Sequence, residues 1–274
     1  MGVQKKIYPL FLVLLFVCQF SISHRVSSSE SQGTASQFST FKLESEILKE
    51  ERSMVVALPE GYEAGDLSYP VLYVLDAEGE NNFSGTVATL NDLVVEKIAS
   101  PMIVVGIRNT NRNRDMIPDS VAHRPGSGGS EKFLEFISDE LMPYVKKNYR
   151  AREFSALYGM SNSALFVVYA LLEKPEAFQA YIASSPMIGH CPDYIESKAQ
   201  SFIKNASAAG RMLYMIYGTE DSSRVTDFVP GFQDDLEKFV HEGFISKLEI
   251  LEGEGHVPES SLRRGLTFVF NLRQ

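Results

Sequence analysis

The chain has 274 residues, 44% of them hydrophobic, and a formal net charge of −9 at pH 7. That length and hydrophobic content are sufficient for one large core in a single domain. An acidic chain repels phosphate backbones and anionic headgroups, so neither nucleic acid nor an anionic membrane is expected as a partner.

The first 23 residues have the pattern of a signal peptide. Lys5 and Lys6 precede an apolar run at 7–20, and Ser21 and Ser23 have the spacing of a site that signal peptidase cuts after Ser23. The apolar run is shorter than the ~20 residues of a membrane-spanning helix, so no stable membrane anchor is expected after cleavage. We therefore predict a secreted or periplasmic protein.

A polar segment separates this leader from the folded part. Residues 24–40 are rich in Ser and Gln and have no periodic apolar pattern, which predicts a disordered lead-in. A hairpin is predicted next, with strands at 41–48 and 54–58 and a charged turn at 49–52. We expect residues 41–274 to form a single domain.

Strands and helices alternate from residue 70 onwards. Apolar runs predict buried strands at 70–75, 102–107, 156–158, 181–183, 211–217 and 248–251. Helical spacing of apolar residues predicts helices at 85–99, 133–145 with a kink at Pro143, 164–172, 232–240 and 262–272. Residues 187–210 are less regular and could form a lid. The alternation predicts an α/β fold, with a mostly parallel central sheet, helices on both faces and an N-terminal antiparallel hairpin at one edge.

The segment 154–186 contains the main candidate for a catalytic residue, Ser161. Only five residues, from Gly159 to Ser163, separate a short apolar strand from an apolar helix. A turn this tight strains the backbone and needs small neighbours two residues before and after its centre. It also raises the Ser161 hydroxyl above the sheet edge, where it can act as a nucleophile. A serine that only caps the helix would fit the same pattern.

A nucleophilic serine needs a base, and the base needs an acid that orients it. In the fold that uses such a turn, the acid and then the histidine follow the serine, each after a later strand. Asp221 follows the strand predicted at 211–217, and His256 follows the strand predicted at 248–251. Glu220 and Asp227 remain alternatives for the acid.

The other four histidines are weaker candidates for the base. His24 lies in the lead-in, His123 precedes Ser161, and His241 falls on the face of an amphipathic helix. His190 follows a strand and could line the substrate pocket, although it comes too early in the chain for a base from the final loop. We therefore expect His256 to be the base and His190 to be a candidate for substrate binding.

Backbone amides and arginines complete the predicted site. The N–H of Asn162, near the helix N-terminus, and the N–H of Ala77 or Glu78, after the strand at 70–75, are candidates for the oxyanion hole. Arg108, Arg112 and Arg114 belong to a loop on the same face that could bind an anionic substrate. Neutralisation of these charges by Asp115 and Asp119 is the alternative. Arg124 follows in the same region.

Ordered motifs over residues 41–272 carry a family resemblance. They include the segments 69–76 (YPVLYVLD), 105–115 (VGIRNTNRNRD), 174–178 (KPEAF), 184–186 (SSP) and 253–256 (GEGH), together with the turn at Ser161. With them the chain resembles the putative-esterase family of α/β hydrolases, which includes enterochelin (ferric siderophore) esterases, esterase D type enzymes and mycolyltransferases.

The resemblance implies an α/β-hydrolase fold and hydrolysis of carboxylic esters without a cofactor or a metal. It places Ser161, Asp221 and His256 at the catalytic positions, with a small-molecule ester, such as a siderophore lactone, as substrate. Acyl transfer to a sugar or lipid acceptor uses the same residues, and a catalytically silent binding protein is the third possibility. Two departures matter: Ser163 and Ala164 follow the nucleophile where most members have Gly, and Ala77 also replaces a Gly.

Overall fold

In this computed structural model the described residues are 1–2, 38–78, 80–203, 208–238 and 243–273. All helices and strands given below lie in the compact unit Ser36–Gln274. Except for residues 1–2 and 38–40, the predicted signal peptide and the predicted lead-in lie outside the described residues. The end of the predicted lead-in is ordered, because β1 begins at Ser39 and Phe38 packs edge-on against Phe83.

The described part of the chain forms one eight-stranded sheet with the order β1-β2-β4-β3-β5-β6-β7-β8. β2 pairs antiparallel with β1 and with β4, and every other neighbouring pair is parallel. The strands are β1 (Ser39–Ser45), β2 (Glu50–Ala57), β3 (Tyr69–Val74), β4 (Ile103–Ile107), β5 (Ala151–Met160), β6 (Ala180–Ser184), β7 (Met212–Gly218) and β8 (Ile245–Leu251). The predicted parallel sheet with an antiparallel hairpin at one edge is confirmed.

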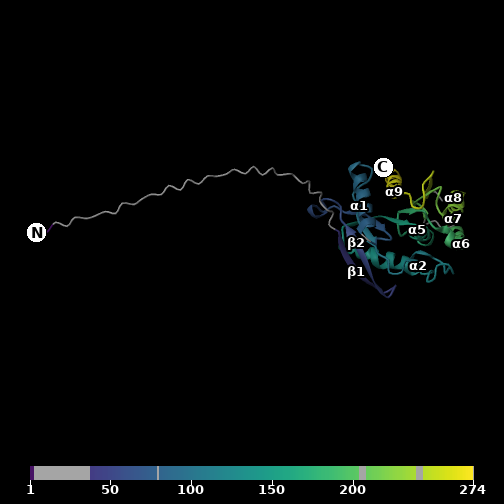
Figure 1. Cartoon of the computed structure of the whole chain (residues 1–274), viewed down its shortest axis with the longest axis horizontal. Coiled ribbons are helices and arrows are strands. Elements are labelled where there is room, and N and C mark those ends of the chain that lie inside the picture. Colours follow the sequence, from purple (N-terminus) through teal and green to yellow (C-terminus); the bar gives the residue numbers. More distant parts are fainter. Residues whose placement is uncertain (3–37, 79, 204–207, 239–242, 274) are drawn as a thin grey trace. The chain divides into compact units, whose positions relative to one another are not determined.

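Helices cover both faces of this sheet (Figure 1). On one face α1 (Glu80–Val95) and α9 (Ser261–Asn271) bury one set of alternating strand residues. The opposite set packs against α3 (Ser130–Glu135), η2 (Phe136–Leu141), α4 (Met142–Asn148), α5 (Asn162–Glu173), α6 (Pro192–Phe202) and α8 (Val229–Lys238). Strands β3, β4, β6 and β7 are buried throughout, which explains why they are continuous apolar runs in the sequence.

The first hairpin turns earlier than predicted. Residues 46–49 form the turn, with Lys49 at φ 57°, and Glu50 already belongs to β2. The carboxylate of Glu140 accepts hydrogen bonds from the backbone N–H of Glu46 (2.9 Å) and Ile47 (3.1 Å). A tertiary contact from η2 thus stabilises the turn, and the charges predicted for the turn at 50–52 instead begin a strand.

The segment predicted as a possible lid is mostly helical where it is described. It contains the 3-10 turn η3 (Ile188–His190) and α6, whose Ile195, Ala199 and Phe202 are buried. The loop predicted after Ile107 likewise contains a short helix, α2 (Arg112–Met116), and the predicted kink at Pro143 lies just after the π-helical turn η2. None of the helices in the described ranges is long and apolar enough to cross a membrane.

Candidate active site

Ser161 occupies the strained turn that its neighbours in the sequence predict. β5 ends at Met160 and α5 begins at Asn162, so Ser161 alone joins strand to helix, with φ 61° and ψ −120°. Positive φ is rare for a residue with a Cβ and indicates a conformation held by its surroundings. A Cβ added to Gly159 would lie 2.5 Å from the Ser163 carbonyl oxygen, so only glycine fits there. The Ser161 N–H donates to the carbonyl of Ser184, which fixes the turn against β6.

Three side chains from distant parts of the chain meet at this turn. His256 Nε2 lies 2.9 Å from Ser161 Oγ, and His256 Nδ1 lies 2.6 Å from Asp221 Oδ1. The Asp221 side chain is fully buried, whereas 41% of the His256 side chain is exposed. The carboxylate accepts the Nδ1 proton, so Nε2 is free to accept the proton of the Ser161 hydroxyl. Asp221 Oδ1 also accepts the Ser222 N–H at 2.6 Å.

The loops that carry the acid and the histidine are held against each other. Glu220 donates its N–H to the Glu254 carbonyl at 2.9 Å, and a Cβ on Gly218 would lie 1.9 Å from that same oxygen. Val257, at φ 59°, donates its N–H to Ser185 Oγ at 2.8 Å. Ser185 directly follows β6, so the end of that strand positions the His256 loop as well as Ser161.

The two alternative acids lie elsewhere. Glu220 is exposed and contributes its backbone to the loop contact with Glu254. Asp227 caps the C-terminal end of α7 (Ser223–Thr226) and accepts a hydrogen bond from Thr226 Oγ1 at 3.2 Å. Asp221 is therefore the carboxylate that the structure places on His256.

The geometry changes one of the two predicted oxyanion donors. The N–H of Ala77 donates to the Ile107 carbonyl at 3.1 Å, so Ala77 cannot serve. The next amide, Glu78, follows a bend at Asp76 with φ 55° and donates to no acceptor within the described ranges. Asn162 is the first residue of α5, and its N–H also has no acceptor there, as is usual in a first helical turn. The candidate pair is therefore Glu78 and Asn162.

Two of the predicted substrate-binding arginines are engaged in ion pairs within the protein. Arg112 forms a two-point contact with Asp76 (Nε to Oδ1 2.9 Å, Nη2 to Oδ2 2.7 Å). Arg114 pairs with Glu50 at 2.6 Å and with Asp115 at 2.7 Å. These ion pairs give Arg112 and Arg114 a role in holding α2, and direct contact between these two arginines and substrate stays a prediction. Asp115 neutralises Arg114 as the alternative anticipated, but the partner of Arg112 is Asp76.

Asp76 is a buried hub beside the turn. It is 8% exposed and accepts hydrogen bonds from Arg112, from Asn109 Nδ2 at 2.6 Å and from Ser163 Oγ at 2.7 Å. Burial raises the pKa of Asp76, but these hydrogen bonds and the charge of Arg112 outweigh burial and hold the pKa below its ordinary value. The carboxylate is therefore ionised at neutral pH.

His190 supports the turn rather than facing outward. It is 3% exposed, its Nδ1 lies 2.8 Å from His123 Nε2, and its Nε2 lies 3.1 Å from Asn162 Oδ1. Both ring nitrogens are engaged, so the expected direct contact between His190 and substrate is not available in this arrangement. Burial, followed by the positive charges of Arg124 and His123, lowers the pKa of His190 to about 4, so the ring is neutral at neutral pH.

Three further arginines keep their charge unneutralised. Within the described ranges, Arg108, Arg124 and Arg224 have no carboxylate partner, and the buried Nε atoms of Arg108 and Arg124 have no hydrogen-bond acceptor. Arg124 and Arg224 lie close enough to His190 to lower its pKa. Since His190 bonds to Asn162, Arg124 and Arg224 lie near the turn that carries Ser161.

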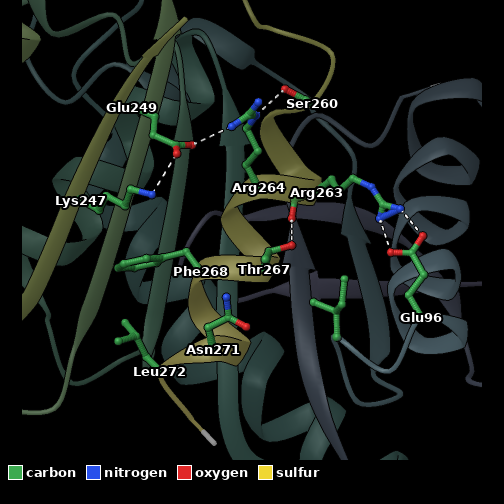
Figure 2. A pocket seen from close by; sticks show the side chains of 11 residues that line it. Glu96, Lys247, Glu249, Ser260, Arg263, Arg264, Thr267, Phe268, Asn271 and Leu272 are labelled. Carbon is green, nitrogen blue, oxygen red and sulfur yellow. Dashed lines mark hydrogen bonds and ion pairs between the residues drawn. The ribbon is translucent and has the colours of Figure 1, made fainter.

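A surface pocket of about 620 Å³ lies elsewhere, between α1, β8 and α9 (Figure 2). Its charges pair with one another: Arg263 with Glu96, and Lys247 and Arg264 with Glu249. Ser161, Asp221 and His256 do not line it.

The sequence analysis missed Asp76 and Ser185 as parts of the active site, although both come directly after buried strands.

The fold and this arrangement of serine, histidine and aspartate define the α/β-hydrolase class. The model of a family described as "Putative esterase" matches residues 45–226. The chain is 27% identical over 213 residues to the ferri-bacillibactin esterase BesA of Bacillus subtilis, an alignment covering 69% of this chain and 74% of that protein. It is 31% identical over 149 residues to a siderophore triacetylfusarinine C esterase of Aspergillus fumigatus, covering 49% and 50%.

Solved structures agree with this assignment. An IroE-like serine hydrolase from Shewanella oneidensis superposes with a TM-score of 0.75 and 28% identity over 86% of this chain and 80% of that one. The siderophore hydrolase EstA of Aspergillus nidulans has a TM-score of 0.76 and 22% identity, covering 92% and 100%, and supports the fold alone. The chain belongs to the putative-esterase family, and it is a carboxylic ester hydrolase.

Proposed function

We propose that Ser161 is the nucleophile of this esterase. As its oxygen bonds to the ester carbonyl carbon, its proton passes to His256 Nε2, and Asp221 stabilises the imidazolium through Nδ1. The carbonyl oxygen becomes an oxyanion that accepts from the N–H groups of Glu78 and Asn162. His256 then returns the proton to the leaving alkoxide. Water hydrolyses the acyl-enzyme by the same steps in reverse, and no cofactor is required.

One observation carries this proposal. The hydrogen-bond chain from Asp221 through His256 to Ser161, at 2.6 Å and 2.9 Å, ends on a serine held at φ 61°. A serine that only capped α5 would need neither a histidine on its hydroxyl nor a buried carboxylate behind that histidine. Its side chain in fact makes no capping hydrogen bond to the helix.

Replacing Ser161→Ala tests the assignment. We expect turnover of a p-nitrophenyl ester to fall by at least ~10³-fold, because the covalent route is lost, with an unchanged far-UV circular dichroism spectrum. Labelling by a fluorophosphonate probe should disappear as well. The exposed Ser197→Ala is the matched control and should keep both activity and labelling. Retained turnover in Ser161→Ala would end the assignment.

For the substrate we propose an anionic ester of the siderophore type. The named relatives are siderophore esterases, and the unneutralised guanidinium groups of Arg124 and Arg224 lie near His190, which bonds to Asn162. Guanidinium groups bind carboxylate and catecholate oxygens well because they donate several hydrogen bonds in one plane. Arg112 and Arg114 support this surface indirectly by holding α2.

We further propose that the chain is exported and that residues 41–274 act as one catalytic domain. The basic and apolar pattern of residues 1–23 supports export. Determining the N-terminal residue of the protein recovered from an exporting host tests this proposal. His24 as the first residue is expected, and an intact Met1 in the exported fraction would contradict it.

A further inference from the structure

We propose that the Ser163 hydroxyl and the Asp76 carboxylate form a clamp that sets the distance between the two oxyanion amides, which makes both side chains positioning residues. The proposal rests on the proposed function, because it concerns the hole that Glu78 and Asn162 provide. Ser163 is the residue at which the sequence departs from the glycine usual in the family, so the clamp is a property of this chain's own turn.

The two amides belong to separate elements. Asn162 begins α5 after the turn at Ser161, whereas Glu78 lies in the loop that follows β3. β3 and β5 are neighbours in the sheet, and their register ends at the pair Val74 and Tyr158. The Leu75 N–H still donates to the Tyr158 carbonyl, and past that bond no backbone hydrogen bond within the described ranges joins the two segments. A contact past the strand ends is needed to fix one amide relative to the other.

Ser163 and Asp76 provide that contact. Ser163 Oγ lies 2.7 Å from Asp76 Oδ2, and both residues are buried, with 0% and 8% exposure. The same oxygen accepts the Met160 N–H at 2.8 Å, one residue before the nucleophile. The hydroxyl has one proton, and an ionised carboxylate is a stronger acceptor than the Met160 carbonyl, which also lies at 2.8 Å. Ser163 therefore connects the serine turn to the loop after β3 directly.

The Asp76 end of the clamp is fixed as well. Arg112 holds both carboxylate oxygens, and Asn109 donates to Oδ1. The backbone of Asp76 is in the left-handed region at φ 55°, and the Ala77 N–H on the Ile107 carbonyl orients the next peptide. These contacts hold the backbone that leads to the Glu78 amide. A shift of Asp76 would therefore move the Glu78 donor.

Ser163→Ala and Ser163→Gly test the clamp without adding bulk. We expect kcat for a p-nitrophenyl ester to fall ~10-fold, less than the 10²–10³-fold that loss of a whole donor costs, with KM within about twofold. The Ki of a trifluoromethyl ketone, whose adduct places an oxyanion in the hole, should rise by a similar factor. Ser155→Ala is the control, because it removes a buried hydroxyl of β5 that does not contact Asp76, and it should change neither kcat nor Ki.

A merely structural role for Ser163 would lower the thermal midpoint but leave kcat and Ki unchanged, and this result would overturn the clamp. Asp76→Asn adds a second measurement. Asp76→Asn weakens the contacts with Arg112 and Asn109 as well as the contact with Ser163, so it should cost more than Ser163→Ala. Adding Ser163→Ala to Asp76→Asn should then cost little more, because the contact between the two residues is already weakened. Failure of the proposed function looks different: wild type would not be labelled by a fluorophosphonate and Ser161→Ala would keep its turnover.

Discussion

At the scale of single residues, the direction of the side chain distinguishes Asp221 from its acidic neighbour Glu220. Glu220 and Asp221 are adjacent, yet the backbone of one bonds to Glu254 while the buried carboxylate of the other bonds to His256. The pattern of the sequence left both open, because acids in one loop look alike until the direction of each side chain is known. The histidine position was easier to predict, since His256 is the one histidine directly after the last strand.

Asp221→Asn should separate the two acids. An amide in place of the carboxylate cannot hold the Nδ1–H tautomer of His256, so we expect kcat to fall by ~10³-fold or more. Glu220→Gln keeps the backbone contact to Glu254 and should stay within about twofold of wild type. Initial rates on a p-nitrophenyl ester between pH 6 and 8 would measure both. Equal losses in the two variants would show that Asp221 is not the orienting acid.

At the scale of elements, a buried ion network anchors α2 beneath the site. Arg52 of β2, with a fully buried side chain, bonds to Asp115 of α2 at 2.7 Å and stacks on Phe133 at 4.9 Å. Arg114 joins Asp115 to Glu50, the first residue of β2. The network fixes the helix that carries Arg112, and through Arg112 it reaches Asp76. The sequence predicted only a charged turn at 49–52 and a charged loop after the strand at 102–107. It could not predict the network, because ion pairs between separate elements leave no periodic signal.

Glu50→Gln should destabilise the fold in a pH-dependent way. The hydrogen bond from Arg114 lowers the pKa of Glu50 to about 2. A lowered pKa adds stability above the ordinary value near 4.5 and loses it as pH falls towards 2. We expect urea unfolding at pH 7 to show a loss of about 1 kcal/mol, a small value because Glu50 stays 26% exposed.

The loss should shrink steadily between pH 5 and pH 2.5 as Glu50 becomes protonated in the unfolded chain and then in the folded protein. Glu51→Gln is the matched control, since its pairing with Lys42 is solvent-exposed and contributes little. A loss in Glu50→Gln that stayed constant with pH would show that the side chain packs but that its charge does not matter.

At the scale of the whole molecule, three unneutralised arginines contrast with the acidic net charge of the chain. The net charge is −9, yet Arg108, Arg124 and Arg224 lack carboxylate partners within the described ranges. The overall field of an acidic protein repels anions, so these arginines would not attract an anionic substrate from a distance. Their unneutralised charge instead favours direct contact with an anionic group of the substrate.

Arg124→Gln should therefore raise KM for an ester with a carboxylate or catecholate group about 5- to 10-fold, the effect of one lost charge-assisted contact. KM for a neutral p-nitrophenyl ester should not change. Steady-state rates for both esters at low and high salt would measure these KM values. Arg273→Gln is the control, because Arg273 stacks on Phe154 at the other end of β5. Equal KM changes for the two esters would exclude the arginine as an anion contact.

The sequence alone was sufficient to predict the sheet, the turn at Ser161 and the order of serine, acid and histidine. Each of these features depends on local apolar runs and on the residues that directly follow them. Tertiary structure decided which amides are available for the proposed oxyanion hole, which arginines are neutralised and what His190 contacts. These features depend on side-chain directions at strand ends, where residues far apart in the chain meet and no periodic pattern records the encounter. Ser163 shows the difference most clearly: in the sequence it is a missing glycine, and in the fold it bonds to Asp76.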